Sequence, residues 1–189
     1  KLCFDPQKGI YADDPGRTFY DQRASILAVL CDAHSAQESK ELMTKVLDKQ
    51  THFDSEANLF YLFYLFEAME KTGIGDFTGQ LQPWKAVVDM GMSGTPEKRI
   101  EQNPRSEIHP WTAHPVHFYF SLVAGIRPAS PGFNTVLIKP NPGSLKSFAA
   151  NYPTRHGIIS VSLSFSGDDI VSGEVNLPGT MNGNVEWKA

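Results

Sequence analysis

The chain has 189 residues, of which 41% are hydrophobic and 20% charged, so it can bury one good core or two small ones. The formal net charge of −4 and the lack of a basic run argue against a nucleic-acid partner and favour a neutral or weakly polar ligand. The sequence has no apolar stretch of the roughly 18 residues that a membrane span needs, so we also expect no membrane partner.

The first segment is expected to be loop, because residues 4–17 are rich in Pro, Gly and Asp and show no periodicity. The two cysteines, Cys3 and Cys31, lack the spacing of a zinc motif. The sequence does not indicate whether they meet.

Two helices are expected next. A helical spacing begins at Thr18. The residues expected on one face of this helix are Ala24, Leu27, Ala28 and Cys31. Ser35 and Glu38 have the Ser-x-x-Glu form of a capping box, which predicts the start of the second helix. Its apolar stripe consists of Leu42, Val46 and Leu47.

Three further helical segments follow. Residues 55–72 are apolar around much of a helix and are followed by Gly73, a typical C-terminal stop. Residues 77–90 form a weaker segment, with Trp84, Val87 and Val88 expected on one side. The last segment covers residues 111–124. Consecutive helical hairpins of this kind suit an α/α toroid, and these helices are too few to close a ring.

After Gly125 the pattern changes to that of β strands. The expected strands are residues 135–139, 158–165, 170–177 and 184–187. In the second of these, Ile159, Val161, Leu163 and Phe165 alternate with serines. We therefore predict a small antiparallel β-sandwich, with a domain of helices at residues 1–126 and a β domain at residues 127–189.

The chemistry is expected to lie between residues 91 and 133. Glu97 occupies a loop of small residues and Pro, where a carboxylate can face a cavity and serve as a general base. His109 precedes Pro110, so it is held extended at the start of a helix, next to Trp111. An indole can stack on a sugar ring and also donate a hydrogen bond. The alternatives are that Glu97 is merely solvated and that His109 and Trp111 pack and cap the helix.

Other kinds of site are less well supported. His114 and His117 would lie one helical turn apart and could be joined by His109 and Glu107 in a metal site. Because His109 precedes the helix and no other ligand motif is present, we expect no metal and no cofactor. The sequence also lacks a Gly-x-Ser-x-Gly elbow and a Gly-rich phosphate loop.

Several motifs in this chain resemble the α-L-rhamnosidase family of glycoside hydrolases. The family's G-x-T-T-x-x-E, R-S-D-C-H-A-W-S-A-x-P and G-I-R-P-x-x-P-G-F patterns are similar to residues 91–97, 105–115 and 125–133. Residues 20–29 and 61–73 resemble its helices, and residues 153–161 resemble its P-T-P-H-G-x-I-x-V strand. The resemblance covers nearly the whole chain, and Gly-Ile-Arg-Pro-Ala-Ser-Pro-Gly-Phe is its most specific part.

The resemblance implies an inverting hydrolase that releases terminal α-L-rhamnose from rhamnose-containing glycosides. Glu97 would be the general base, and His109 and Trp111 would bind the sugar. It also implies the C-terminal part of an (α/α)6 six-hairpin domain followed by a C-terminal β-sandwich. The chain departs from the pattern where Gly94 replaces Thr, Pro96 precedes the Glu, and Glu107 and Ile108 replace Asp and Cys.

In this family the general acid lies in an earlier loop of the toroid. We therefore expect this chain to be a fragment that is inactive alone and pairs with the missing N-terminal part of the same polypeptide. Self-association through the exposed half-toroid is an alternative. Two other functions stay open: a six-hairpin glycosidase with a different sugar specificity, and a noncatalytic carbohydrate-binding module.

Overall fold

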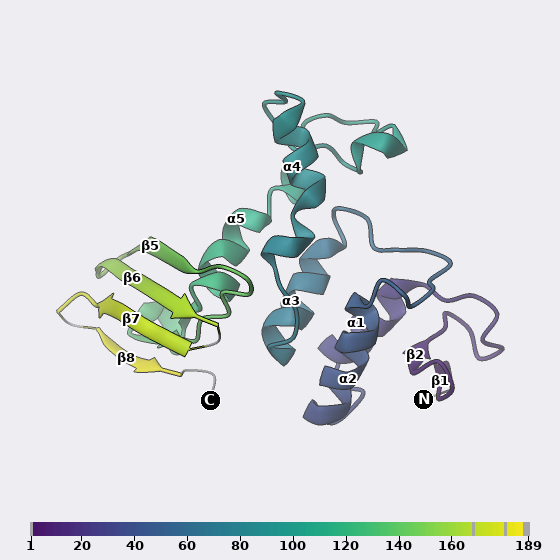
Figure 1. The fold of residues 1–189 in the computed structure, drawn as a ribbon, viewed down its shortest axis with the longest axis horizontal. Helices are drawn as coiled ribbons and strands as arrows, with labels where there is room; N and C mark the ends of the chain where they lie inside the picture. Colours follow the sequence, from purple (N-terminus) through teal and green to yellow (C-terminus); the bar gives the residue numbers. More distant parts are fainter. Residues whose placement is uncertain (1, 168, 180, 187–189) are drawn as a thin grey trace. The chain divides into compact units, whose positions relative to one another are not determined.

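The structure is a computed structural model that describes residues 2–167, 169–179 and 181–186 (Figure 1). The chain divides into two compact units. The helical unit comprises Lys1–Gly75 and Leu81–His114, and the β unit comprises Asp76–Gln80 and Pro115–Ala189. The predicted change from helices to β strands along the chain is confirmed. Among the described residues, no helix has the length and apolar character needed to cross a bilayer.

The helical unit begins with a short antiparallel pair, β1 (Phe4–Asp5) and β2 (Ile10–Tyr11), in a region for which only loop was expected. Its main helices are α1 (Gln22–Leu30), α2 (Ala36–Leu47), α3 (Leu62–Thr72) and α4 (Gln82–Asp89). Helix α1 contacts both α2 and α3. Fully buried side chains of the unit include Ile26, Met43, Leu59, Leu65, Phe66 and Met69.

Helix α1 starts at Gln22 rather than Thr18, because Asp21 caps it by accepting a hydrogen bond from the backbone N–H of Arg23. Its buried residues are Ser25, Ile26, Ala28 and Val29. The predicted buried face was therefore partly wrong, since Leu27 is 38% exposed and Cys31 is also exposed. A run of adjacent apolar residues permits several stripes, and packing against α2 and α3 selects one of them.

Helices α2 and α3 follow their sequence signals at the ends that carry a cap. The capping box of Ser35 and Glu38 is present at the start of α2, and Gly73 ends α3 with φ 69° in the left-handed region. The start of α3 was predicted too early, at residue 55. The preceding residues are instead tied to α1: Ser55 O accepts from the N–H of Gln22, and Ala57 N–H donates to Gln22 Oε1, both at 2.9 Å.

Two predicted helices are interrupted at prolines. Helix α4 begins with Pro83 in its first turn, and a separate 3-10 turn, Thr78–Gln80, precedes it. Trp84 and Val87 are buried as expected, but Val88 is 73% exposed. The segment predicted as one helix over residues 111–124 consists of a 3-10 turn (Pro110–Thr112), α5 (Pro115–Phe118) and a π-helical turn (Tyr119–Val123). Pro115 disfavours helical geometry at the residue before it.

The β unit contains two three-stranded sheets. One has the order β3 (Ile126–Pro128), β4 (Thr135–Ile138), β8 (Asn182–Val185); the other has the order β5 (Ser147–Thr154), β6 (Gly157–Ser166), β7 (Asp169–Asn176). The pairing of β4 with β8 is parallel, contrary to the prediction of an all-antiparallel module. The other pairs in both sheets are antiparallel.

Both sheets contribute to one hydrophobic core in the β unit. Its buried members are Ala124, Ile126, Val136, Ile138, Ile159, Val161, Leu163 and Met181. The predicted alternation along β6 is confirmed for Ile159, Val161 and Leu163, whereas Phe165 lies at the partly buried edge. Strands β3 and β5 were not predicted, and Trp187 of the expected last strand lies outside the described residues.

Candidate functional site

Two loop segments of the helical unit are held side by side by backbone hydrogen bonds. The N–H of Glu97 donates to Ser106 O at 2.9 Å, and the N–H of His109 donates to Thr95 O at 2.7 Å. The Thr95 hydroxyl also donates to His109 O at 3.2 Å. The structure therefore brings together Glu97 and His109, which are far apart in the loop sequence.

Thr112 links the two loop segments through its side chain. Its hydroxyl lies 2.9 Å from Pro96 O and 2.8 Å from His109 O, and the residue is fully buried. The indole N–H of buried Trp84 donates to Thr112 O at 2.7 Å. The Thr112 hydroxyl thus bonds to both segments, and the Thr112 backbone carbonyl is bonded to Trp84 of α4.

Glu97 is paired with Arg105. Arg105 Nε donates to Glu97 Oε2 at 3.1 Å, and Arg105 Nη2 forms an ion pair with Oε1. The Glu97 side chain is 17% exposed and that of Arg105 79%. Hydrogen bonding from Arg105 lowers the pKa of Glu97, with smaller contributions from the charges of Arg105, Lys98 and His109. The pairing with Arg105 therefore favours the ionised form of the Glu97 carboxylate.

Two departures from the family pattern compensate for each other in size. A Cβ added at Gly94 would lie 3.0 Å from Cγ1 of Ile108. The bulky Ile at one position therefore matches the missing side chain at the other. Glu107, another departure, is exposed and takes no part in the hydrogen bonds that join the two loop segments.

His109 and Trp111 form an aromatic edge on the segment that pairs with the Glu97 loop. Their rings contact each other edge-on with centroids 5.7 Å apart. Trp111 is 68% exposed, so most of its indole is available to a ligand. The 3-10 turn Pro110–Thr112 positions it, and its ring also lies 5.4 Å from that of Phe60.

The histidines that the sequence suggested as metal ligands lie in different environments. His114 precedes α5 instead of lying within a helix, its Nε2 lies 2.9 Å from Leu59 O, and its ring packs on Phe66 and Trp84. His117 is exposed on α5. Within the described ranges, no group of three or more His, Cys, Asp or Glu side chains is arranged to hold a metal ion.

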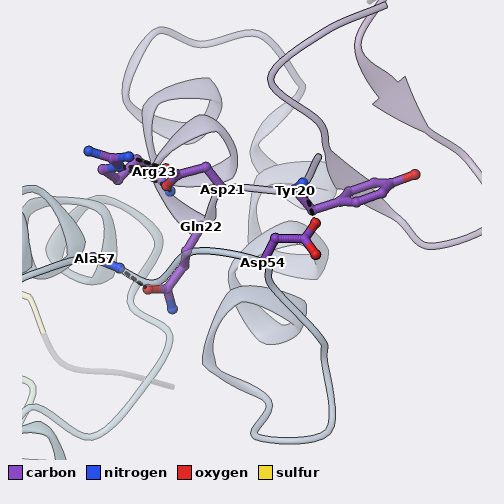
Figure 2. A network of polar contacts seen from close by, with 6 residues as sticks. All are labelled: Tyr20, Asp21, Gln22, Arg23, Asp54 and Ala57. Carbon is purple, nitrogen blue, oxygen red and sulfur yellow. Dashed lines mark hydrogen bonds and ion pairs between the residues drawn. The ribbon is translucent and has the colours of Figure 1, made fainter. Parts of the chain in front are cut away.

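A second arginine–carboxylate pair lies at the start of α1 (Figure 2). Asp21, only 2% exposed, pairs with Arg23 through both carboxylate oxygens. Around it, Asp54 Oδ2 accepts a hydrogen bond from the backbone N–H of Tyr20 at 2.8 Å, and Gln22 Oε1 accepts one from the backbone N–H of Ala57. The carboxylate of Asp21 is fully engaged in capping α1 and binding Arg23.

Sequence reasoning did not assign roles to Arg105 and Phe60. Arg105 opens the motif that supplied His109 and Trp111, so its place in the pattern was a usable signal. Phe60 had no such signal, because it is one aromatic among many in an apolar segment. Only the fold brings Phe60 to Trp111.

Residues 125–186 match the family model described as the bacterial α-L-rhamnosidase C-terminal domain. The predicted resemblance to α-L-rhamnosidases is confirmed. A comparison with curated protein sequences found no match.

Solved rhamnosidase structures share the fold of most of the chain. The family GH78 rhamnosidase of Bacillus sp. GL1 has a TM-score of 0.77 at 22% identity, over 97% of this chain and 21% of that one. The Streptomyces avermitilis α-L-rhamnosidase complexed with L-rhamnose has a TM-score of 0.68 at 20% identity, over 87% of this chain and 18% of that one. The Aspergillus terreus α-L-rhamnosidase has a TM-score of 0.69 at 20% identity, over 87% of this chain and 21% of that one. The chain therefore spans about a fifth of the length of these relatives.

Proposed function

We propose that this chain is the C-terminal part of an inverting glycoside hydrolase that releases terminal α-L-rhamnose from rhamnosides. The observation that carries the proposal is the backbone pairing that holds the Glu97 loop against the segment that presents His109 and Trp111. In this proposal residues 1–126 belong to an (α/α)6 toroid and residues 127–189 form a β-sandwich domain. Likeness in fold to rhamnosidases over most of the chain supports this assignment.

Glu97 would take a proton from a water molecule on the face of the sugar opposite the leaving group. The resulting hydroxide oxygen bonds to the anomeric carbon as the glycosidic bond breaks, and a second carboxyl group protonates the departing oxygen. Inverting enzymes separate the two groups by about 6.5–9.5 Å, which leaves room for the water. His109 and Trp111 would hold the rhamnose ring. We place the general acid outside this chain, in the part of the polypeptide that precedes it.

The test is hydrolysis of p-nitrophenyl α-L-rhamnoside by the longer polypeptide that contains this chain, with and without Glu97→Gln. Because glutamine cannot accept the proton, we expect kcat to fall about a thousandfold or more, with folding unchanged. The matched control is Glu107→Gln, an exposed carboxylate of the same loop, which should keep activity within about twofold.

Full activity of the Glu97→Gln variant would place the base elsewhere. Activity on another aryl glycoside but not on the rhamnoside would contradict the proposed sugar specificity and leave Glu97 as the proposed base. The chain alone should be inactive, so robust hydrolysis by residues 1–189 would contradict the proposal that the general acid lies outside this chain.

A further inference from the structure

Trp111 is supported by two separate contacts. Its ring lies 5.4 Å from the ring of Phe60, measured between centroids, with the two planes tilted by 42°. Its backbone belongs to the 3-10 turn Pro110–Thr112, and the carbonyl of Thr112 accepts a hydrogen bond from the Trp84 indole N–H at 2.7 Å. The position of the Trp111 indole therefore depends both on where Phe60 lies and on where Trp84 lies.

His114 contacts both of these supports. Its Nε2 lies 2.9 Å from Leu59 O, and because a carbonyl oxygen can only accept, Nε2 carries the hydrogen and donates it. Leu59 is fully buried and directly precedes Phe60, so this hydrogen bond fixes the backbone from which the Phe60 ring extends. The His114 ring also packs edge-on against Trp84, with the ring centroids 5.3 Å apart.

The contacts of His114 lie in the interior of the helical unit. Its ring is also edge-on to Phe66 at 5.5 Å and to Phe63 at 5.7 Å, measured between centroids. Phe66 and Leu59 are fully buried, and Trp84 is buried as well. Three ring contacts and one hydrogen bond therefore hold the imidazole in one orientation.

Packing alone does not account for a histidine at this position. A phenylalanine would make similar ring contacts with Phe63, Phe66 and Trp84, but it could not donate a hydrogen bond to Leu59 O. Placing a polar imidazole among apolar rings costs free energy unless its nitrogen is hydrogen-bonded. The hydrogen bond to Leu59 is therefore what the imidazole adds here.

We infer that His114 is a positioning residue that holds Trp111 in the orientation that binds rhamnose. It acts through Phe60, which contacts the indole, and through Trp84, which is bonded to the turn that carries the indole. This inference rests on the proposed function, because it takes Trp111 to bind the sugar. A Trp111 side chain that moves freely must be ordered when the sugar binds, which weakens binding without changing the chemical step.

The test compares His114→Leu with His114→Gln in the longer polypeptide that contains this chain. Leucine removes the donor, whereas the glutamine amide can still donate to Leu59 O. With p-nitrophenyl α-L-rhamnoside we expect KM to rise about fivefold in His114→Leu, from the ordering of one side chain, while kcat stays within about twofold. In His114→Gln, KM should return to within about twofold of the unsubstituted value. His117→Leu, at an exposed histidine of α5, is the control and should alter neither constant.

A double substitution tests whether His114 acts through Trp111. Trp111→Ala alone should raise KM more than His114→Leu does. When His114→Leu is added to Trp111→Ala, KM should change by less than about twofold further, because the side chain that His114 positions is already gone. Two rises in KM that multiply would show that His114 acts elsewhere and would overturn the inference.

The remaining outcomes separate this inference from the proposed function. If circular dichroism shows that His114→Leu does not fold, His114→Asn replaces it, because its shorter amide stays polar without reaching Leu59 O, and the same rise in KM is expected. An unchanged KM, or a fall in kcat alone, overturns the positioning role while rhamnosidase activity stands. If the unsubstituted polypeptide does not hydrolyse the rhamnoside, the proposed function fails and this inference fails with it.

Discussion

The helical unit contains two arginine–carboxylate pairs that differ in what surrounds them. Asp21 and Arg23 lie at the start of α1, where the aspartate side chain is 2% exposed and the arginine 41%. Glu97 and Arg105 lie on paired loops, where the corresponding values are 17% and 79%. Charge and pairing are alike, so accessibility is the main difference.

The pKa of both carboxyl groups is lowered, but the causes differ in relative size. Burial by itself would raise the pKa of Asp21, and the hydrogen bonds from the Arg23 side chain and backbone outweigh it. For Glu97 the hydrogen bond from Arg105 dominates. A depressed pKa is therefore no sign of function in this protein. The Asp21 pair stabilises a helix start, while the Glu97 carboxylate stays partly open to solvent.

The two pairs should differ most in how much they contribute to the free energy of unfolding. Asp21→Ala removes a helix cap and leaves Arg23 without its partner, so we expect unfolding to become easier by about 2–3 kcal/mol. Glu97→Ala should change the free energy of unfolding much less, because its partner is exposed. Urea denaturation followed by circular dichroism measures both. Equal losses would mean that the two pairs have the same structural role.

The Asp21 contribution also depends on pH. Because the pKa of Asp21 in the folded protein lies below its usual value of 3.8, its stabilisation is complete above that value and is lost as the pH falls through the folded pKa. The difference between the unsubstituted protein and Asp21→Ala should therefore shrink in strongly acidic solution.

Thr112→Val tests how the loops hold Glu97 in place. Valine has a similar volume but leaves the buried carbonyl of Pro96 without the hydroxyl, while His109 O keeps its bonds from the Thr112 N–H and the Thr95 hydroxyl, so we expect a loss of about 1–2 kcal/mol. Because the loop pairing loosens, kcat/KM should also fall about fivefold. Thr44→Val is the control, since its hydroxyl bonds to Lys40 O on an exposed helix face. A stable variant with full activity would show that Thr112 does not position the site.

The smallest effect is expected from Arg105→Ala. Arg105 is exposed, so the free energy of unfolding should hardly change. Without its hydrogen bond the pKa of Glu97 rises toward its ordinary value, and the acidic limb of the pH–rate profile should move to higher pH. Lys98→Ala, which removes a weaker influence on Glu97, should move the limb less. An unmoved limb in Arg105→Ala would argue that Glu97 is not the titrating base.

Sequence predicted the elements whose signals are local. The Ser35–Glu38 capping box, the Gly73 helix stop and the alternation along β6 all depend on neighbouring residues, and all are confirmed. The face of α1 and the start of α3 depend on packing and on hydrogen bonds to distant segments. Those features could not be derived from periodicity.

The same division holds for the candidate site. Glu97, His109 and Trp111 were proposed from loop chemistry and motif, and their catalytic and binding roles stay predictions. The hydrogen bonds from Glu97 to Ser106 and from His109 to Thr95 pair positions nine and fourteen residues apart. No local pattern reports such pairing, and the approach of Phe60 to Trp111 spans a still longer separation.

The parallel strand β8 has a consequence for the order of biosynthesis. Strand β4 lies at the centre of its sheet only because residues 182–185 pair with residues 135–138. Until the ribosome has released β8, β4 is an open edge that carries Val136 and Ile138, both of which are fully buried in the finished protein. Exposed apolar edges recruit other strands. One edge of β4 therefore stays uncovered from the synthesis of β4 until β8 has been made.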